Sequence, residues 1–218
     1  MTPNQIIAEV RNLIQDTRVT YRYSDAVLLG FVNQTIKRMV LLRPDLFITQ
    51  TDIATTPNVV EQSLPSTAVR LVEIFRTKTG TAVEEVDRDQ FNRAYPAWVN
   101  DPAGLPVKYM RHPRNPNRFF VYPRPTAGVL LVGEYVDTPP VYTIDQPISV
   151  LSDSYFSVMV DGVVFLAESV DNEYVSSNRA KLFQDSFLQS LGVSLQSRNL
   201  IDSESAAAPA PQQTRSAE

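Results

Sequence analysis

The stretch Ser24–Pro44, SDAVLLGFVNQTIKRMVLLRP, decides the fold because it predicts one complete helix with both of its ends. Ser24 suits the N-cap position, and the helix dipole favours the carboxylate of Asp25 in the first turn. Apolar residues recur at helical spacing, at Val27, Leu28, Phe31, Val32, Ile36, Met39 and Val40. Pro44 has no amide hydrogen to continue the helical ladder, so we expect the helix to end there.

The residues before this stretch predict a second helix. Thr2-Pro3-Asn4-Gln5 has the pattern of an N-cap, a proline in the first turn and a glutamine that closes a capping box. An apolar stripe follows at helical spacing, at Ile6, Ile7, Val10, Leu13 and Ile14. Residues 1–45 are therefore predicted to form a helical pair.

After Pro44 the pattern changes to short β-branched and aromatic runs divided by Pro, Asn, Asp and Gly. The predicted strands are Leu46–Ile48, Val69–Phe75, Val107–Met110, Phe119–Tyr122 and Val129–Val136. Ten of the 16 prolines fall between Pro96 and Pro147, which excludes a long helix there. A brief helical turn capped by Asp87 is expected before Tyr95. The sequence thus predicts a β-rich lobe over residues 46–150.

Helical spacing returns after Ser152, with one helix to about Val170 and a second from about Asp171 to near Gly192. Neither helical pair can bury its apolar stripe alone. We therefore expect an α+β fold: a four-helix bundle formed by residues 1–45 and 151–200, with the β-rich lobe inserted between helices 2 and 3. The residues expected to share the core of the bundle are Phe31, Ile36, Met39, Phe183 and Phe187.

The last residues, 201–218, are predicted to form an extended tail. They contain Ile201 as their final large apolar residue and then Ala206, Pro209 and Pro211 among other small and polar residues. Such a segment has no core of its own, but it can lie in a groove of a partner through main-chain hydrogen bonds. We expect this tail to dock on a partner protein.

The composition excludes several classes of protein. The chain has 218 residues, 43% hydrophobic and 20% charged, as in globular domains. No apolar run approaches the length of a membrane span, and the N-terminus lacks the pattern of a signal peptide. Cysteine is absent, which excludes disulfides and sulfur-based zinc sites and fits a reducing compartment. The net charge of −4 argues against nucleic-acid binding as the main source of affinity.

Candidate catalytic residues are few. The single histidine, His112, lies where a turn is expected, so it fits a surface turn better than a catalytic base or a metal ligand. Four carboxylates could bind a divalent cation through oxygen, but a strand end that runs into a capped turn explains them better: Glu84, Glu85, Asp87 and Asp89. No phosphate-binding glycine loop or nucleophile–base pair is present. The sequence therefore predicts neither an enzyme nor a cofactor.

Charge is segregated along the chain. Residues 102–133 contain no acidic residue but carry Lys108, Arg111, Arg114, Arg118 and Arg124. Residues 125–178 contain no Lys or Arg but eight carboxylates, including Asp153, Asp161, Glu168 and Asp171. A solvated hairpin beside an acidic helix face explains this pattern without any function. The functional interpretation is a contact between identical subunits or with a partner protein, and a basic loop that touches DNA is a third possibility.

Several motifs resemble, in order, those of the head-to-tail adaptor (connector) proteins of tailed bacteriophages. They are Tyr23–Ala26, Phe31–Asn33, Leu42–Phe47, Gln62–Pro65, Val69–Val72, Val86–Asp89, Tyr95–Trp98, Asn115–Pro123 and Asp171–Tyr174. The resemblance covers about residues 3–195, and the layout is similar to that of tail tubular protein A of short-tailed phages. One departure is the absence of a Lys or Arg from Val163 to Glu168.

The resemblance implies a structural protein of the virion, made in the host cytoplasm and located at the head–tail junction. It implies a ring, usually of twelve copies, that lies below the portal protein, extends the DNA channel and carries the tail nozzle or tube. We expect Lys108, Arg111, Arg114 and Arg118 to contact a neighbouring adaptor or a tail component. The acidic residues Asp153, Asp161, Glu168 and Asp171 are expected at the lumen or a subunit interface. The tail with Ile201, Ala206, Pro209 and Pro211 is expected to dock on the portal. Alternatives are a tail-completion or stopper ring, a nucleic-acid-binding module and a hydrolase with an unrecognised carboxylate pair.

Overall fold

The computed structural model describes residues 1–18, 20–170 and 177–206, with backbone alone for 177 and 193–206. The chain forms two compact units. Unit 1 contains Met1–Ile36 and Tyr142–Glu218, and unit 2 contains Lys37–Val141. The described residues form five α-helices and two β-sheets, which confirms the predicted mixed α+β class.

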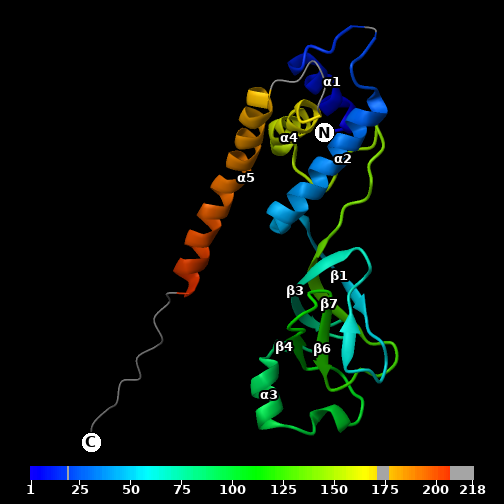
Figure 1. Cartoon of the computed structure of the whole chain (residues 1–218). Helices are drawn as coiled ribbons and strands as arrows, with labels where there is room; N and C mark the ends of the chain where they lie inside the picture. The colour runs from blue at the N-terminus through cyan, green and yellow to red at the C-terminus, as the bar shows by residue number, and fades with distance from the viewer. Residues whose placement is uncertain (19, 171–176, 207–218) are drawn as a thin grey trace, which may run out of the picture. The chain divides into compact units, whose positions relative to one another are not determined.

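Unit 1 is helical (Figure 1). Its helices are α1 (Pro3–Leu13), the first part of α2 (Asp25–Leu42), α4 (Phe156–Glu168) and α5 (Ser177–Ala206), with a 3-10 turn η3 (Asp153–Tyr155) before α4. The predicted capping box at Thr2 and Gln5 is confirmed. α4 packs against α1 and α5, so the two predicted helical pairs share one unit. Their arrangement as a four-helix bundle stays a prediction.

Gly162 of α4 lies where three helices meet. A Cβ added at Gly162 would lie 2.5 Å from Cγ2 of Thr35 in α2 and 3.0 Å from a ring carbon of Phe187 in α5. Such distances are shorter than van der Waals contact, so only glycine allows the helices to approach this closely. The buried residues Ile36 and Phe187 belong to unit 1 as predicted, whereas Met39 lies in the part of α2 assigned to unit 2.

The segment from Tyr142 to Val150, which we expected at the end of the β-rich lobe, belongs to unit 1. The amide side chain of Asn33 in α2 accepts a hydrogen bond from the Tyr142 backbone N–H at 2.8 Å and donates one to its carbonyl at 3.1 Å. The Ile144 carbonyl accepts from the backbone N–H of Asn4, 2.9 Å away. These contacts give a proline-containing segment the hydrogen bonds that a helix or strand would otherwise supply.

Unit 2 is a pair of sheets packed face to face. The first sheet has the order β1 (Ile48–Ala54), β7 (Leu130–Asp137), β3 (Ala68–Thr77), all antiparallel. The second has the order β2 (Glu61–Ser63), β6 (Arg118–Tyr122), β5 (Lys108–Arg111), β4 (Glu84–Glu85), with β4 parallel to β5. Both sheets contribute to the core, which includes Ile53, Leu71, Ile74, Leu131 and Tyr135 from the first and Tyr109, Phe119 and Val121 from the second.

Four of the five predicted strands are confirmed as β3, β5, β6 and β7, and Asp87 caps the predicted helical turn, α3 (Arg88–Ala94). The fifth prediction, Leu46–Ile48, is largely wrong. Residues Pro44–Phe47 form a 3-10 turn, η1, and β1 begins only at Ile48. The reason is that Pro44 fixes a turn-like backbone angle at the start of the segment. A further 3-10 turn, η2 (Trp98–Asn100), follows α3.

Candidate functional site

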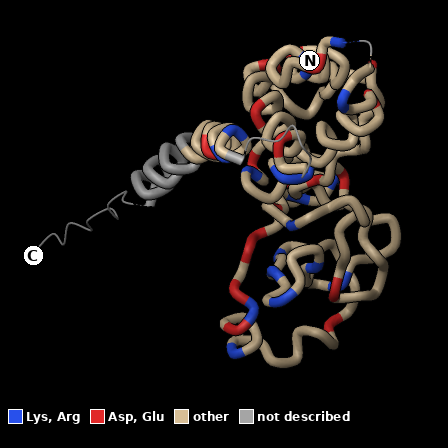
Figure 2. Tube along the Cα trace, turned by 45° about the horizontal axis from the view of Figure 1, so that its top comes forward, with Lys and Arg blue, Asp and Glu red and all other residues tan. Residues whose placement is uncertain are grey.

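Of the four basic residues expected to contact a partner, Lys108, Arg111 and Arg118 lie on strands of the second sheet and pair with carboxylates of the same subunit. Lys108 Nζ lies 3.8 Å from Glu84, Arg118 Nη1 lies 2.9 Å from Glu61, and Arg111 pairs with Glu85. The partners come from the neighbouring strands β2 and β4. In unit 2, Lys and Arg positions therefore lie among Asp and Glu positions (Figure 2).

Arg111 joins the two sheets. Its Nε donates to Oε1 of Glu85 at 2.6 Å, while its Nη atoms donate to the carbonyls of Leu71 and Val72 in β3. The Tyr109 hydroxyl also donates to Glu85, at 2.6 Å. The hydrogen bond from Arg111 lowers the pKa of Glu85, and burial raises the pKa of Tyr109. Arg111 thus has a structural role, which the sequence prediction of a partner-binding residue missed.

Arg114 differs from the other three. It is exposed in the turn between β5 and β6, and no carboxylate of the described residues pairs with it. Nδ1 of His112 accepts hydrogen bonds from the backbone N–H groups of Arg114 and Asn115, at 3.2 and 2.9 Å. This geometry confirms that His112 is a turn residue. A hollow of about 180 Å³ beside the turn is lined by His112, Arg111, Arg118 and Arg70, and Arg70 is likewise exposed without a described ion pair.

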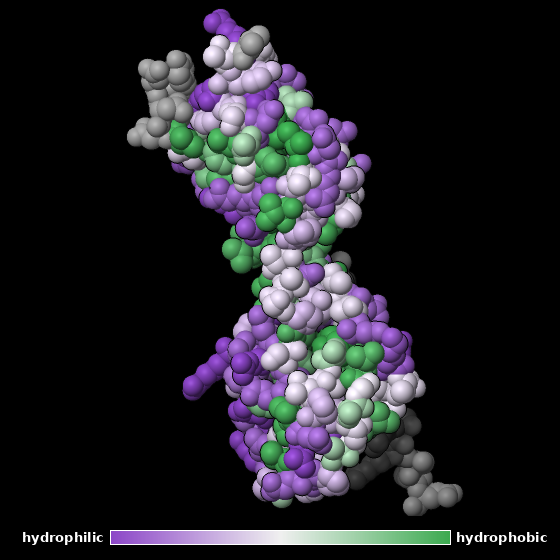
Figure 3. Space-filling model, turned by 90° about the vertical axis from the view of Figure 1, so that its right-hand side faces the viewer, coloured by the Kyte–Doolittle hydropathy of each residue, from purple (hydrophilic) through white to green (hydrophobic). Residues whose placement is uncertain are grey.

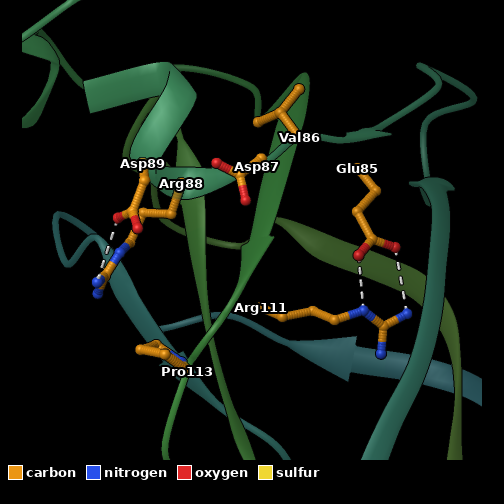
Figure 4. A pocket seen from close by; sticks show the side chains of 7 residues that line it. All are labelled: Glu85, Val86, Asp87, Arg88, Asp89, Arg111 and Pro113. Atoms are coloured by element: carbon orange, nitrogen blue, oxygen red, sulfur yellow. Dashed lines mark hydrogen bonds and ion pairs between the residues drawn. The ribbon is translucent and has the colours of Figure 1, made fainter. Parts of the chain in front are cut away.

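The carboxylates considered as a cation site do not converge. Three of them, Glu85, Asp87 and Asp89, line a hollow of about 360 Å³. Figure 4 shows that Glu85 faces Arg111 there and Asp89 faces Arg88. Asp87 caps α3 by accepting from the Gln90 backbone N–H at 2.8 Å. No group of three His, Asp or Glu side chains suited to a metal ion occurs in the part of the chain that the structure describes. The interpretation as a strand end running into a capped turn is confirmed.

The acidic residues of unit 1 lie in different environments. Asp153 is 82% exposed and accepts from the N-terminal ammonium group, and Asp161 accepts from the Ser186 hydroxyl at 2.7 Å. Glu168 is only 3% exposed and lies 4.0 Å from Arg22. The expectation that Glu168 contributes to an acidic surface is therefore wrong, because its carboxylate balances a cation inside the subunit. Asp171 lies outside the described residues.

A buried ionic cluster joins α1 to α2, and the sequence analysis missed it. The Arg11 guanidinium donates to Asp16 at 2.8 Å, to Asp25 at 2.6 Å and to the carbonyl of Tyr23 at 2.9 Å. The Tyr23 hydroxyl in turn donates to the Ala167 carbonyl of α4 at 2.7 Å. The sequence did contain a signal for it: Arg11 lies one helical turn after Ile7 on the apolar stripe, where a charged side chain indicates a buried ion pair. This cluster fixes the α1–α2 turn against α4.

An aromatic cluster covers one end of the second sheet. The rings of Phe91, Tyr95, Trp98 and Tyr122 lie 5.1–6.4 Å apart, mostly edge to face. Both tyrosine hydroxyls donate to Asp101, at 2.6 and 2.7 Å. These hydrogen bonds lower the pKa of Asp101, and the bond to Asp101 raises the pKa of Tyr122 to about 12. The cluster explains why Tyr95–Trp98 is aromatic without a ligand.

The prediction of an extended tail is wrong for residues 201–206. α5 continues to Ala206, so the backbone at Ile201 and Ala206 is helical. Ser203–Ala206 contains no Pro or Gly, and its Glu and Ala favour helix. Pro209 and Pro211 lie outside the described residues. Within the described residues, no helix is both long and apolar enough to cross a membrane.

Comparison with known families decides what kind of protein this is. A family model described as SU10 adaptor protein matches residues 1–215. The chain belongs to the SU10 adaptor protein family. The predicted resemblance to the head-to-tail adaptors of tailed phages is thereby confirmed, and membership in the SU10 adaptor family identifies a bacteriophage adaptor, a component of the virion. No curated protein matches the chain.

Proposed function

We propose that this SU10 adaptor forms a ring beneath the portal protein, of twelve copies as its family resemblance implies. The ring extends the DNA channel and carries the tail nozzle or tube. The observation that supports it best is the opposite charge of the two units. Unit 1 carries 7 Lys and Arg against 13 Asp and Glu, whereas unit 2 carries 13 against 11.

Opposite charges suit a head-to-tail contact, in which unit 2 of one copy meets unit 1 of the next. A closed ring of identical subunits needs two different complementary surfaces on each subunit. Charge complementarity sets the register of such a contact and suppresses wrong pairings. On the face drawn in Figure 3, apolar patches are interspersed with hydrophilic side chains on both units, which favours a contact selected by charge.

The residues best placed for this contact are the exposed charges without a strong internal partner. In unit 2 these include Arg70 and Arg114. In unit 1 they include Asp145 and Asp185, which are exposed on the 142–150 segment and on α5. Lys108, Arg111 and Arg118 contribute less, because an ion pair that already exists must be broken before a new one forms. Three of the basic residues of the stretch 108–124 that a nucleic-acid-binding module would use already form internal ion pairs, so that alternative is less well supported.

The remaining acidic surface of unit 1, including Asp153 and Asp161, is proposed to face the lumen or a neighbouring subunit. A ring through which DNA slides must avoid tight phosphate contacts, and like charge keeps the DNA mobile. A lumen lined mainly by Lys and Arg in an image of the assembled particle would contradict this part of the proposal.

Ring assembly on purified portal, followed by electron microscopy and native mass spectrometry, tests the function. The variant Arg70→Glu/Arg114→Glu should lose most rings at low salt, because it places acid against acid. The matched control Arg18→Glu/Lys181→Glu makes the same change in net charge on unit 1 and should still assemble. Equal assembly of both variants across a salt series would show that charge complementarity is not used, and absence of rings from the unchanged protein would overturn the adaptor-ring proposal itself.

A further inference from the structure

The outer edge of β1 is an open strand edge. Thr55 donates its backbone N–H to Val129 next to β7, so by the two-residue period Thr49, Thr51 and Ile53 exchange hydrogen bonds with β7. The backbone N–H and C=O groups of Ile48, Gln50, Asp52 and Ala54 therefore point away from the sheet. No described residue bonds to these four pairs of groups. The edge is ready to accept another strand.

The other sheet edges are protected. Along β3, Arg111 donates to the carbonyls of Leu71 and Val72, and the Phe75 carbonyl accepts from the N–H of Val83. β2 and β4, the edges of the second sheet, have only three and two residues. β1 is seven residues long and contains no Pro or Lys, the residues that most often block an edge, and its one charged residue, Asp52, is ion-paired with Lys78 of the same subunit. Among the described strands, β1 alone is long, open and unguarded.

Residues 207–218, AAPAPQQTRSAE, have prolines at alternate positions, a pattern that suits a strand that pairs along one edge only. In a strand, alternate residues direct their backbone groups to opposite edges, so Pro209 and Pro211 would remove two N–H groups from the same edge. Ala208, Ala210, Gln212 and Thr214 would present four complete N–H and C=O pairs to the other edge. A proline also holds the residue before it in an extended conformation, which lowers the entropy cost of pairing.

We infer that residues 208–214 of one copy add as an antiparallel strand to the outer edge of β1 in the next copy. Antiparallel register places Ala208 opposite Ala54 and Thr214 opposite Ile48, so that all four backbone pairs on each side are satisfied. The proline edge then faces outward and blocks further strand addition. Each copy then supplies one tail strand to a neighbour and accepts one at its own β1 edge. Such a contact can close around a ring, so this inference rests on the proposed ring.

Cysteine cross-linking tests the inference, and the chain contains no cysteine of its own. Thr49→Cys and Gln213→Cys would form a non-hydrogen-bonded pair with Cα atoms about 4.5 Å apart, within the range for a disulfide. Each substitution is placed in a separate copy, and the two proteins are mixed, assembled on portal and oxidised. We expect a cross-linked dimer. Thr49→Cys mixed with Gln212→Cys is the control, because residue 212 directs its side chain to the opposite face.

A second pair of variants tests the edge. Gln212→Pro removes an N–H that faces β1 and should reduce the cross-link yield about fivefold, the factor that corresponds to one hydrogen bond of about 1 kcal/mol. In these cross-links, Ala54→Cys is paired with Ala208→Cys, which lie directly opposite each other in the proposed register with Cα atoms about 5.5 Å apart. Gln213 is then free for the matched variant Gln213→Pro, which removes an outward N–H and should leave the yield unchanged.

The outcomes separate this inference from the proposed function. Rings that form without a mixed cross-link overturn the strand addition and leave the ring intact. A cross-link confined to one chain, obtained only when both cysteines are in the same copy, overturns the exchange between copies. Loss of portal attachment on deletion of 207–218, without any mixed cross-link, assigns the segment to the portal instead. If the unchanged protein forms no ring, the proposed function fails first.

Discussion

Replacing Gly162 by alanine sets two opposing effects against each other. Gly162 lies within α4, where alanine is the better helix former, yet its position leaves no room for a methyl group. The added Cβ would lie 2.5 Å from Cγ2 of Thr35 and 3.0 and 3.1 Å from two ring carbons of Phe187. Thr35 is fully buried and Phe187 is nearly so. Neither neighbour can therefore move into solvent to relieve the contact.

The magnitudes indicate that the clash is the larger effect. Alanine in place of glycine in a helix interior stabilises by roughly 0.8–1.0 kcal/mol. Extra methylene groups forced into a packed core cost typically about 1–3 kcal/mol. Because the clash involves two buried neighbours on two different helices, we place its cost in the upper part of that range. Gly162→Ala is then expected to lower the free energy of unfolding by roughly 1–2 kcal/mol.

Urea unfolding followed by two probes measures the effect. Far-ultraviolet circular dichroism reports mainly on the helices of unit 1, while the fluorescence of Trp98, the single tryptophan, reports on unit 2. The control is Gly30→Ala in α2, where no atom lies within 4 Å of the added Cβ. Only the gain in helix propensity remains there, so Gly30→Ala should raise the stability of the helices by up to about 1 kcal/mol.

A double-mutant cycle identifies the contact. Thr35→Ser removes the methyl group that meets the new Cβ but retains the hydroxyl, which donates to the Phe31 carbonyl at 2.9 Å. Thr35→Ser should cost about 1 kcal/mol in the wild-type background and nearly nothing beside Gly162→Ala, a coupling of about 1 kcal/mol. The reasoning is refuted if Gly162→Ala is as stable as the wild type, or if the two substitutions are additive.

Four further predictions concern the packing or the titration of single residues. Phe187→Ala should lower the free energy of unfolding by about 3–5 kcal/mol, because Phe187 is buried and a cavity would remain; a loss below 1 kcal/mol in the helical transition would contradict its core position. Gly133→Ala should destabilise unit 2 and shift the Trp98 transition to lower urea, since its Cβ would lie 2.5 Å from the Glu73 carbonyl oxygen; an unchanged midpoint would contradict it. In the folded protein the pKa of Asp101 lies below its ordinary value of 3.8. Ionised Asp101 therefore stabilises the fold above about pH 3.8, and this stabilisation is lost as the pH falls through the folded-state pKa. Likewise, the raised pKa of Tyr122 predicts stabilisation below pH 10.0 that is lost as the pH rises to about 12, which ultraviolet titration of the phenol would detect.

The helices could be predicted from sequence because their signals are local. A cap, an apolar stripe at helical spacing and a proline lie within one or two turns of each other, and the capping box at Thr2 and the end of α2 before Pro44 followed from them. The strand β3 shows the limit of such patterns. Its buried residues Ala68, Leu71, Ile74 and Thr77 recur every third position, because register shifts occur between them. The apolar composition of this segment was enough to identify the strand, but the segment lacks the two-residue alternation of buried and exposed residues that usually identifies one.

The partners of the charged residues could not be predicted in the same way. Arg111 and Arg118 lie in a stretch without acidic residues, yet their carboxylates come from 26 and 57 positions away in the chain. Which strands become neighbours depends on sheet order, and sheet order is not a local property of the sequence. Ion pairs within a unit do not change the net charge of that unit, because the net charge is the sum over all of its residues. An assembly test that reverses Arg111 would therefore disrupt a sheet and resemble a failed interface, whereas reversal of Arg70 and Arg114 changes the charge of the unit and leaves the described ion pairs intact.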